Sequence, residues 1–372
     1  MGRCRGHIAT EGSRVFSNIH DPSVRFADTS PRASRVGRKN DERSFVPSFT
    51  YDFPYASKKL PVFAGNVVVS SQHLAATAGL RMLARGGNAV DAAIASAAAI
   101  TVVEPTMNGI GSDAFCILWD GARLVGLNAS GLSPALMTPD RYAGQDKMPS
   151  VGWGSVSVPG AVSLWVALHG RYGKLPFADL FEPAIKYASD GFRVSYMVAH
   201  QWQRQIERLK GQESWVNAFL PGGRAPKPGE IWKFPDQAKT LTKIAESKGE
   251  AFYRGELAWA MDKYARETGG ALRKEDLAEH KPDWVEPIGL TYRGTTLQEI
   301  PPNGQGIAAL MALGILENFD LAGHDADGPE VAHLRIEAMK LAFADAWRYV
   351  ADPRFMDVTP KELLDKHYLK SR

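Results

Sequence analysis

The chain has 372 residues, of which 44% are hydrophobic and 23% are charged. These proportions are ordinary for soluble globular proteins, so composition excludes the collagen-like, disordered and membrane-embedded classes. The net charge of +3 arises in residues 1–46, where nine Lys and Arg face five Asp and Glu, which leaves −1 for the rest of the chain. Because the rest of the chain is nearly neutral, it lacks the clustered Lys and Arg side chains that bind a phosphate backbone, and we expect no nucleic acid partner.

Residues 1–46 are rich in Arg, Ser, Gly and Asp and show no hydrophobic period. This composition predicts a flexible basic arm, with the folded body at residues 47–372. No apolar segment of signal-peptide length follows the first arginines, and the most apolar run, Ala92–Val103, is too short to span a bilayer. The sequence as written therefore predicts a cytoplasmic protein with no membrane partner; a wrongly assigned start codon would leave a periplasmic location open.

The folded body begins with a β-branched run, Val67–Ser71, followed by apolar residues at helical spacing. We expect a strand and then a helix that ends at Gly86 and Gly87, because glycine enters the left-handed C-cap conformation without a steric penalty. Asn88 is a suitable N-cap for a second helix, from about Ala89 to Val103. Its small side chains on all faces predict a central buried helix.

A glycine-rich segment and a hairpin come next. The segment Asn108–Asp113 lacks the third glycine of nucleotide-binding loops and precedes a strand, so it predicts a tight turn that lets the backbone approach another segment closely. We expect two strands after it, at Phe115–Trp119 and Arg123–Asn128. Asp120-Gly121 between them is a strong hairpin signal.

The middle of the chain, about residues 160–280, is mostly helical in pattern, with breaks at glycine-containing turns. A β-rich stretch at Ile288–Ile300 and two helices, Gln305–Asn318 and about Glu330–Val350, follow it. Pro360–Arg372 predicts a surface helix that begins at the proline. Strands flanked by helices, with a helical insertion, predict a mixed α/β (α+β) fold.

Side chains that could carry out catalysis unaided are scarce. The sequence has no Gly-x-Ser-x-Gly elbow and no His-x-x-x-His pair, and its nine histidines are scattered. Two cysteines, Cys4 and Cys116, are too few for a disulfide framework or a zinc site, so we expect no metal. Cys116 reads as a small buried residue, and His73 and His333 read as structural histidines. A self-contained serine or zinc hydrolase is not supported.

Motifs along most of the chain occur in the order found in one enzyme family. The longest, Gly86–Ala95, reads GGNAVDAAIA, and it is followed by Ser157–Val162, Phe252–Gly255, Ile315–Asp320 and Asp352–Phe355. From about residue 67 to residue 372 the chain thus resembles the gamma-glutamyltransferase family. The resemblance implies the αββα sandwich of the N-terminal-nucleophile hydrolases, with this chain as the large-subunit part and a mainly helical middle region.

The resemblance also implies where catalysis takes place. In that family one precursor cuts itself, and the threonine at the new N-terminus of the small subunit is the nucleophile, with its own α-amine as the base. No such threonine motif follows Phe355. We therefore expect no catalytic residue in this chain, no activity from it alone, and a small-subunit partner that carries the threonine. No cofactor is implied, because an amine, a hydroxyl and backbone donors suffice.

One departure from the family pattern bears on the substrate. The family places an Arg, which binds the α-carboxylate of the glutamyl group, where this chain has Ser130. A hydroxyl cannot replace a bidentate guanidinium contact. Ser130 and Asn128 are the candidate substrate-binding residues, suited to a smaller or less charged acyl group. The alternative, that both merely close a turn into Gly131, stays open.

Three hypotheses for function follow. The first is a gamma-glutamyltransferase or glutathione hydrolase that acts on a gamma-glutamyl substrate. The second is an amidohydrolase or acylase of the same family that acts on another small-molecule amide, such as an oxamate-like or cephalosporin-side-chain-like compound, and Ser130 favours it. The third is a non-catalytic scaffold or binding subunit, which predicts no threonine-initiated partner.

Overall fold

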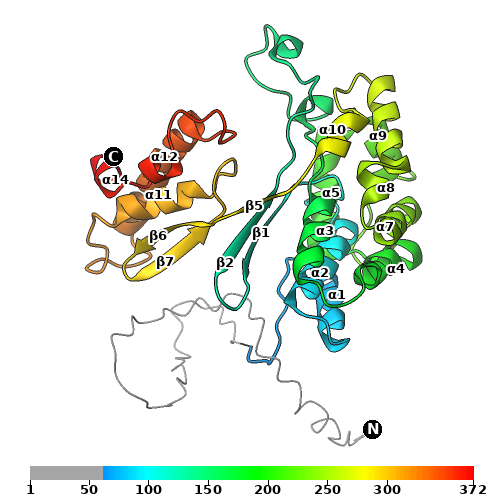
Figure 1. The fold of residues 1–372 in the computed structure, drawn as a ribbon, viewed down its shortest axis with the longest axis horizontal. Helices are drawn as coiled ribbons and strands as arrows, with labels where there is room; N and C mark the ends of the chain where they lie inside the picture. The colour runs from blue at the N-terminus through cyan, green and yellow to red at the C-terminus, as the bar shows by residue number, and fades with distance from the viewer. Residues whose placement is uncertain (1–61) are drawn as a thin grey trace, which may run out of the picture.

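The computed structural model describes residues 62–372. The arm predicted at residues 1–46 lies outside the described residues, as does the start of the predicted body. A helical mass that extends from α1 to α10 lies on one side of a small sheet, and a unit formed by β6, β7 and helices α11 to α14 lies on the other (Figure 1). The sheet therefore stands between two bodies of unequal size.

The helical mass begins with α1 (His73–Ala84) and α2 (Ala89–Val103). Gly86 has a φ of +84°, which glycine adopts without strain, and the Asn88 carboxamide accepts hydrogen bonds from the first turn of α2. Eleven of the fifteen residues of α2 are buried. The predicted glycine stop, N-cap and central buried helix are thus confirmed.

The strand predicted at Val67–Ser71 does not form. The segment has no ladder partner among the described residues, and Val67 and Val69 are 46% and 87% exposed. A β-branched run becomes a strand only where a neighbour pairs with its backbone and covers its side chains. The prediction was wrong because the described chain supplies no such neighbour.

The middle of the chain is mainly helical, as expected. Its only strands within the described residues are β3 (Phe192–Arg193) and β4 (Ile231–Trp232), which pair with each other. The helices are α3 (Ala161–Tyr172), η3 (Phe177–Phe181), α4 (Glu182–Asp190), α5 (Tyr196–Leu209), α6 (Glu213–Phe219), α7 (Pro235–Ser247), α8 (Glu250–Tyr253), α9 (Glu256–Glu267) and α10 (Lys274–Glu279). Two short turns, η1 (Pro139–Tyr142) and η2 (Trp153–Ser155), lie in the loop before them. One hydrophobic cluster joins most of these helices to α1 and α2.

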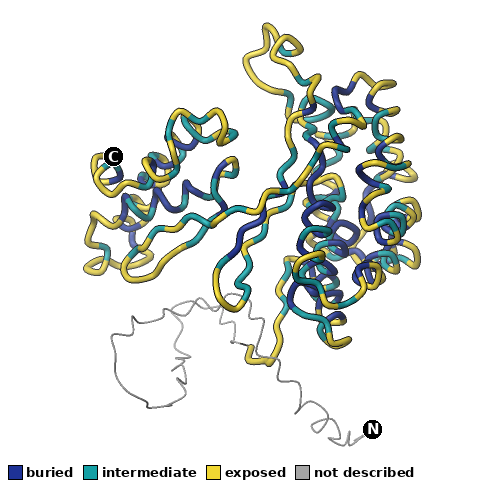
Figure 2. Tube along the Cα trace, viewed as in Figure 1, coloured by how far each residue is buried: buried dark blue, intermediate teal, exposed yellow. Residues whose placement is uncertain are grey.

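The sheet consists of β1 (Ala114–Trp119), β2 (Leu124–Ala129) and β5 (Asp283–Val285), in the antiparallel order β1-β2-β5. The predicted hairpin is confirmed. Leu127 and Ala129 of β2 are buried toward the helical mass, whereas Phe115 and Ile117 of β1 are 46% and 39% exposed on the opposite face. We call this second face the open face of the sheet. Figure 2 shows that β2 is the more deeply buried of these two strands.

The remaining unit contains the hairpin β6 (Ile288–Tyr292) and β7 (Thr295–Glu299), with α11 (Ile307–Leu316) and α12 (Pro329–Tyr349). These elements share a second hydrophobic cluster with the end of the chain. The single surface helix predicted at residues 360–372 is instead α13 (Pro360–Leu363) and α14 (Lys366–Ser371). Asp365 is the N-cap of α14, so a new helix begins there. Leu363 and Leu369 are buried in the second hydrophobic cluster, so this segment packs against β6, α11 and α12. Within residues 62–372, no helix is both long and apolar enough to cross a bilayer.

Candidate functional site

Both predicted substrate-binding residues lie at the end of β2, and a third residue joins them. The Ser130 hydroxyl lies 2.7 Å from Asn128 Oδ1, and Asn128 Nδ2 donates to Asn303 Oδ1 at 2.8 Å. Asn303 Nδ2 lies 2.9 Å from Ser130 Oγ. We call Asn128, Ser130 and Asn303 the polar cluster.

The strand register decides which way the cluster faces. Asn128 pairs with Phe115 across the hairpin, so the two side chains lie on the same face, and Ser130 lies on that face because side chains alternate along a strand. Ala129 between them is fully buried. Asn303 reaches the cluster from the loop between β7 and α11. The cluster therefore belongs to the open face, beside exposed apolar side chains.

Two glycines bring the backbone of β2 close to the start of α3. A Cβ at Gly131 would collide with the carbonyl of Val158, and one at Gly160 would collide with the carbonyl of Ala129. Only glycine fits where two backbones cross this closely. This crossing fixes the position at which the chain leaves Ser130.

The glycine-rich segment before β1 supports the same crossing. Its predicted turn forms, because the Ser112 amide donates to the Gly109 carbonyl at 3.1 Å, and the Ser112 carbonyl accepts from Gly160 and Ala161 at the start of α3. The predicted close approach of this backbone to another segment is thereby confirmed, although at Gly111 itself an added Cβ would meet nothing within 4 Å among the described residues. A second and closer approach lies at Gly131 and Gly160, and the sequence pattern did not reveal it.

The polar cluster is uncharged. Its three side chains bond to one another, and no cation bonds to any of them within residues 62–372. One charged side chain is connected to this region by a hydrogen bond. Asp113 accepts a long hydrogen bond of 3.3 Å from the Gly131 amide. Arg123 is exposed at the turn of the hairpin, where its amide donates to Asp120, so its side chain is a solvated charge at the end of the hairpin. The cluster can exchange neutral hydrogen bonds with a ligand, but it offers no cationic partner to a carboxylate.

The turn interpretation of Ser130 also has support. The Ser130 amide donates to Asn128 Oδ1 at 2.9 Å, which is the local bond of an Asx turn. That bond uses one acceptor of the Asn128 side chain and leaves the Ser130 hydroxyl and the Asn303 amide on the open face. The turn therefore forms and orients the hydroxyl, and a substrate-binding role for Ser130 and Asn128 stays a prediction.

Ser163, in the first turn of α3, lies beside His280, at the end of α10. Ser163 Oγ is 2.9 Å from His280 Nε2 and donates to the Gly160 carbonyl at 2.7 Å. The carbonyl can only accept, so it competes with the imidazole for the single hydroxyl proton, and the tautomer of His280 decides which group donates between the two side chains. Ser163 is 8% exposed, so the pair has little access to a substrate and supports the first turn of α3.

Tyr253 completes this buried support. Its hydroxyl donates to the Pro159 carbonyl at 2.8 Å and accepts from the Ser163 amide at 3.0 Å. Burial raises the pKa of Tyr253 to about 12, so the phenol stays neutral. The residues around Gly160 are therefore held by Ser163 within the same turn and by Tyr253 and His280 from distant parts of the chain.

Cys116 is the one cysteine within residues 62–372. Cys116 is half-buried against the first hydrophobic cluster, and burial raises the pKa of its thiol to about 11, as befits a packing residue. Across residues 62–372, no group of three or more His, Cys, Asp or Glu side chains is placed to hold a metal ion.

The fold places the chain in a class. Solved structures of N-terminal-nucleophile hydrolases share it: a cephalosporin acylase from Bacillus halodurans has a TM-score of 0.81 at 46% identity, over 88% of this chain and 62% of that one. A gamma-glutamyltranspeptidase from Helicobacter pylori has a TM-score of 0.79 at 29% identity, over 84% of this chain and 92% of that one. The predicted fold class is confirmed.

The sequence comparison gives the family. The family profile described as Gamma-glutamyltranspeptidase matches residues 75–372. The chain belongs to this family. It is 38% identical over 307 residues to the glutathione hydrolase-like YwrD proenzyme of Bacillus subtilis, and 36% identical over 313 residues to the oxamate amidohydrolase proenzyme of Klebsiella pneumoniae. Each alignment covers 82% of this chain and 58% of the relative, so the chain spans little more than half their length.

Sequence reasoning missed Asn303 and the pair formed by Ser163 and His280. The Asn303 contacts cross more than 170 residues, and the Ser163 contact crosses 117. A pattern read in windows of ten to twenty residues carries no information on such contacts. The one local signal near Asn303 is Pro301-Pro302, which ends the β-rich stretch.

Proposed function

We propose that this chain is the large subunit of an enzyme that cleaves or transfers an acyl group from a small-molecule amide. The threonine nucleophile would stand at the N-terminus of a separate small subunit. Membership of the family supports this proposal, as do the relatives that are named proenzymes. The chain also spans 92% of the H. pylori gamma-glutamyltranspeptidase chain but only 58% of the proenzymes.

The open face supports a partner at this position. Phe115 and Ile117 leave apolar surface uncovered there, and β1 is an edge strand of its sheet. An apolar sheet face is stable when another layer covers it, and an edge strand offers unpaired backbone groups to a further strand. A small subunit that covers this face would bring its N-terminal threonine toward the polar cluster.

For the acyl group, the polar cluster favours an amidohydrolase or acylase over a strict gamma-glutamyl enzyme. This choice depends on one observation: Ser130 forms hydrogen bonds with the uncharged side chains of Asn128 and Asn303 and with no cation among the described residues. A carboxylate bound beside these residues would lose its water without gaining a cation, which is unfavourable. We infer an acyl group that presents a neutral polar end to Ser130.

The presence of the partner is tested first. Intact-mass analysis and N-terminal sequencing of the natively purified protein should show a second chain that begins with Thr. A protein that contains this chain alone and still cleaves no amide would favour the scaffold hypothesis instead.

Acyl specificity is tested with a matched pair of substrates in the two-chain enzyme. Gamma-glutamyl p-nitroanilide carries an α-carboxylate, and its α-carboxamide analogue replaces that group with a neutral one. We expect the wild type to prefer the carboxamide. Ser130→Arg should shift the ratio of kcat/KM toward the carboxylate by about tenfold or more, since hydrogen bonds to charged groups contribute about 1.5–3 kcal/mol.

Ser133→Arg is the matched control for this experiment. Ser133 is exposed three residues further along the same loop and has no side-chain hydrogen bond within the described residues. The added charge alone should leave the substrate ratio unchanged. A wild type that already prefers the α-carboxylate tenfold would contradict the proposed specificity and leave the two-chain proposal standing.

A further inference from the structure

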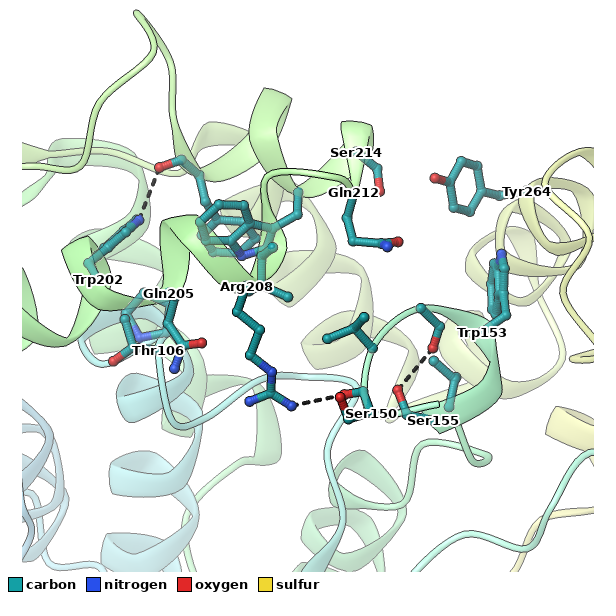
Figure 3. A pocket seen from close by; sticks show the side chains of 17 residues that line it. Thr106, Ser150, Trp153, Ser155, Trp202, Gln205, Arg208, Gln212, Ser214 and Tyr264 are labelled. Atoms are coloured by element: carbon teal, nitrogen blue, oxygen red, sulfur yellow. Dashed lines mark hydrogen bonds between the residues drawn. The ribbon is translucent and has the colours of Figure 1, made fainter. Parts of the chain in front are cut away.

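A cavity of about 460 Å³ lies outside the site described above (Figure 3). Its walls come from α5, α6, α9, residues 150–156 and residues 105–106, and none of the polar cluster lines it. The volume is in the range of small-molecule binding sites, about 300–1,000 Å³. Neither the family resemblance nor the proposed chemistry makes use of this space.

Aromatic rings form much of the cavity wall. The rings of Trp153 and Tyr264 have centroids 5.8 Å apart, and those of Trp215 and Phe219 stack at 5.8 Å with planes 18° apart. The Trp153 indole N–H donates to Thr268 Oγ1 at 2.8 Å, which fixes the ring. Rings held in this way offer faces and edges on which a planar ligand can pack.

One cation reaches the cavity and no anion does. Among the described lining residues Arg208 carries the only charge. Its Nη2 donates to the Ser150 carbonyl at 2.8 Å, as Figure 3 shows, while residues 62–372 give no protein partner to its Nη1 or Nε and no carboxylate within ion-pair distance. A guanidinium with two free donors matches a carboxylate.

Neutral polar groups complete the lining. The carboxamides of Gln205 and Gln212 are half-buried, and neither has a side-chain hydrogen bond within the described part of the chain. In Figure 3 the Gln212 carboxamide points toward the side on which Trp153 and Tyr264 lie. The cavity thus combines aromatic surface, one unpaired cation and free amide groups.

We propose that this cavity binds a small planar aromatic carboxylate, with its ring against the aromatic walls and its carboxylate on Arg208. A neutral ring compound would leave the Arg208 guanidinium without an anionic partner. A small anion without a ring would leave the aromatic side chains of the cavity exposed to water. The site goes beyond the proposed function and does not depend on it, because no residue of the polar cluster or of a second chain takes part.

Isothermal titration of the full chain with 2-naphthoate tests this proposal. We expect binding of one molecule per chain. 2-Naphthamide, the neutral isostere, should bind at least tenfold more weakly, and this comparison requires no mutation. Arg208→Ala should weaken 2-naphthoate binding about tenfold or more and should abolish the preference for the anion.

Two variants serve as controls. Arg204→Ala removes an exposed cation from the same helix that does not line the cavity, and it should bind 2-naphthoate like the wild type. Phe115→Ala alters the open face of the sheet, where an apolar compound could bind instead, and it should also leave binding unchanged. The proposal is overturned by a wild type that binds neither compound or both equally, by an unaffected Arg208→Ala, or by loss of binding in Phe115→Ala.

Discussion

Asn303 and Ser130, 173 residues apart in the sequence, lie side by side, with Asn303 Nδ2 2.9 Å from Ser130 Oγ. Asn303 follows β7 of the C-terminal unit, and Ser130 follows β2 of the central sheet. The two hydrophobic clusters found in residues 62–372 share no buried residue. This contact is therefore a polar junction between parts of the chain that have separate cores.

Replacement of Asn303 by Ala separates a binding role from a structural one. Asn303 is exposed, so we expect the free energy of unfolding to fall by less than about 1 kcal/mol, the usual net value of one hydrogen bond. In the two-chain enzyme kcat/KM should fall about tenfold, because the residue orients Ser130. Urea unfolding and amide hydrolysis measure the two effects. Gln305→Ala, two residues away and also exposed, should change neither; equal activity of both variants would contradict a role in binding.

How much of this structure can be predicted from the sequence depends on the distance between the groups involved. The cap at Asn88 and the turn at Asp120-Gly121 form within a few residues, and both were predicted. The segment Val67–Ser71 has the composition of a strand but lacks a neighbour in the described chain, so local propensity was insufficient there.

The same reasoning applies to the candidate site. Asn128 and Ser130 could be chosen because the family pattern departs locally at Ser130, but the neutral partner Asn303 depends on tertiary folding. From the sequence, Gly131 is predicted only at the end of a turn, and no contact is predicted for Gly160. Their close approach involves Gly131 and Gly160, which are 29 positions apart and meet only when β2 crosses the start of α3.

Gly131→Ala tests that crossing. The new Cβ would overlap the Val158 carbonyl, a backbone group that cannot move aside alone, so we expect destabilisation of about 3 kcal/mol or failure to fold. Gly170→Ala is the matched control, because it lies within α3 with nothing within 4 Å of the added Cβ among the described residues. This control should gain about 0.5–1 kcal/mol from helix propensity. Urea denaturation followed by circular dichroism compares them, and similar midpoints would refute the crossing.

Asp91 is a second position with a large expected effect. Its carboxylate is fully buried and accepts from the amides of Asn88 at 2.9 Å, Lys174 at 3.0 Å and Leu175 at 3.2 Å. Asp91→Ala leaves these donors without a partner, so we expect a loss of about 3 kcal/mol in the free energy of unfolding. Asp236→Ala removes an exposed carboxylate from the first turn of α7 and should cost less than about 1 kcal/mol. Equal losses would show that the Asp91 network contributes little.

His280 makes the stability of the chain depend on pH in a defined direction. Burial lowers the pKa of His280, although Asp283 and Asp113 act in the opposite sense. In the unfolded chain its pKa returns to about 6.5, so as the pH falls below that value the unfolded state takes up the proton more readily than the folded state. The stabilising contribution of the neutral ring is complete above about pH 6.5. It is lost progressively as the pH falls toward the lower pKa of the folded state.

Urea unfolding of wild type and His280→Gln between pH 5.5 and pH 7.5 measures this dependence. Glutamine keeps a donor for Ser163 Oγ but does not titrate, so the wild type should lose more stability on acidification than the variant. His324→Gln alters an exposed histidine in the loop before α12 and should retain the pH dependence of the wild type. If His280→Gln and the wild type lose the same free energy of unfolding over this range, protonation of His280 is not coupled to folding, and its contact with Ser163 serves packing alone.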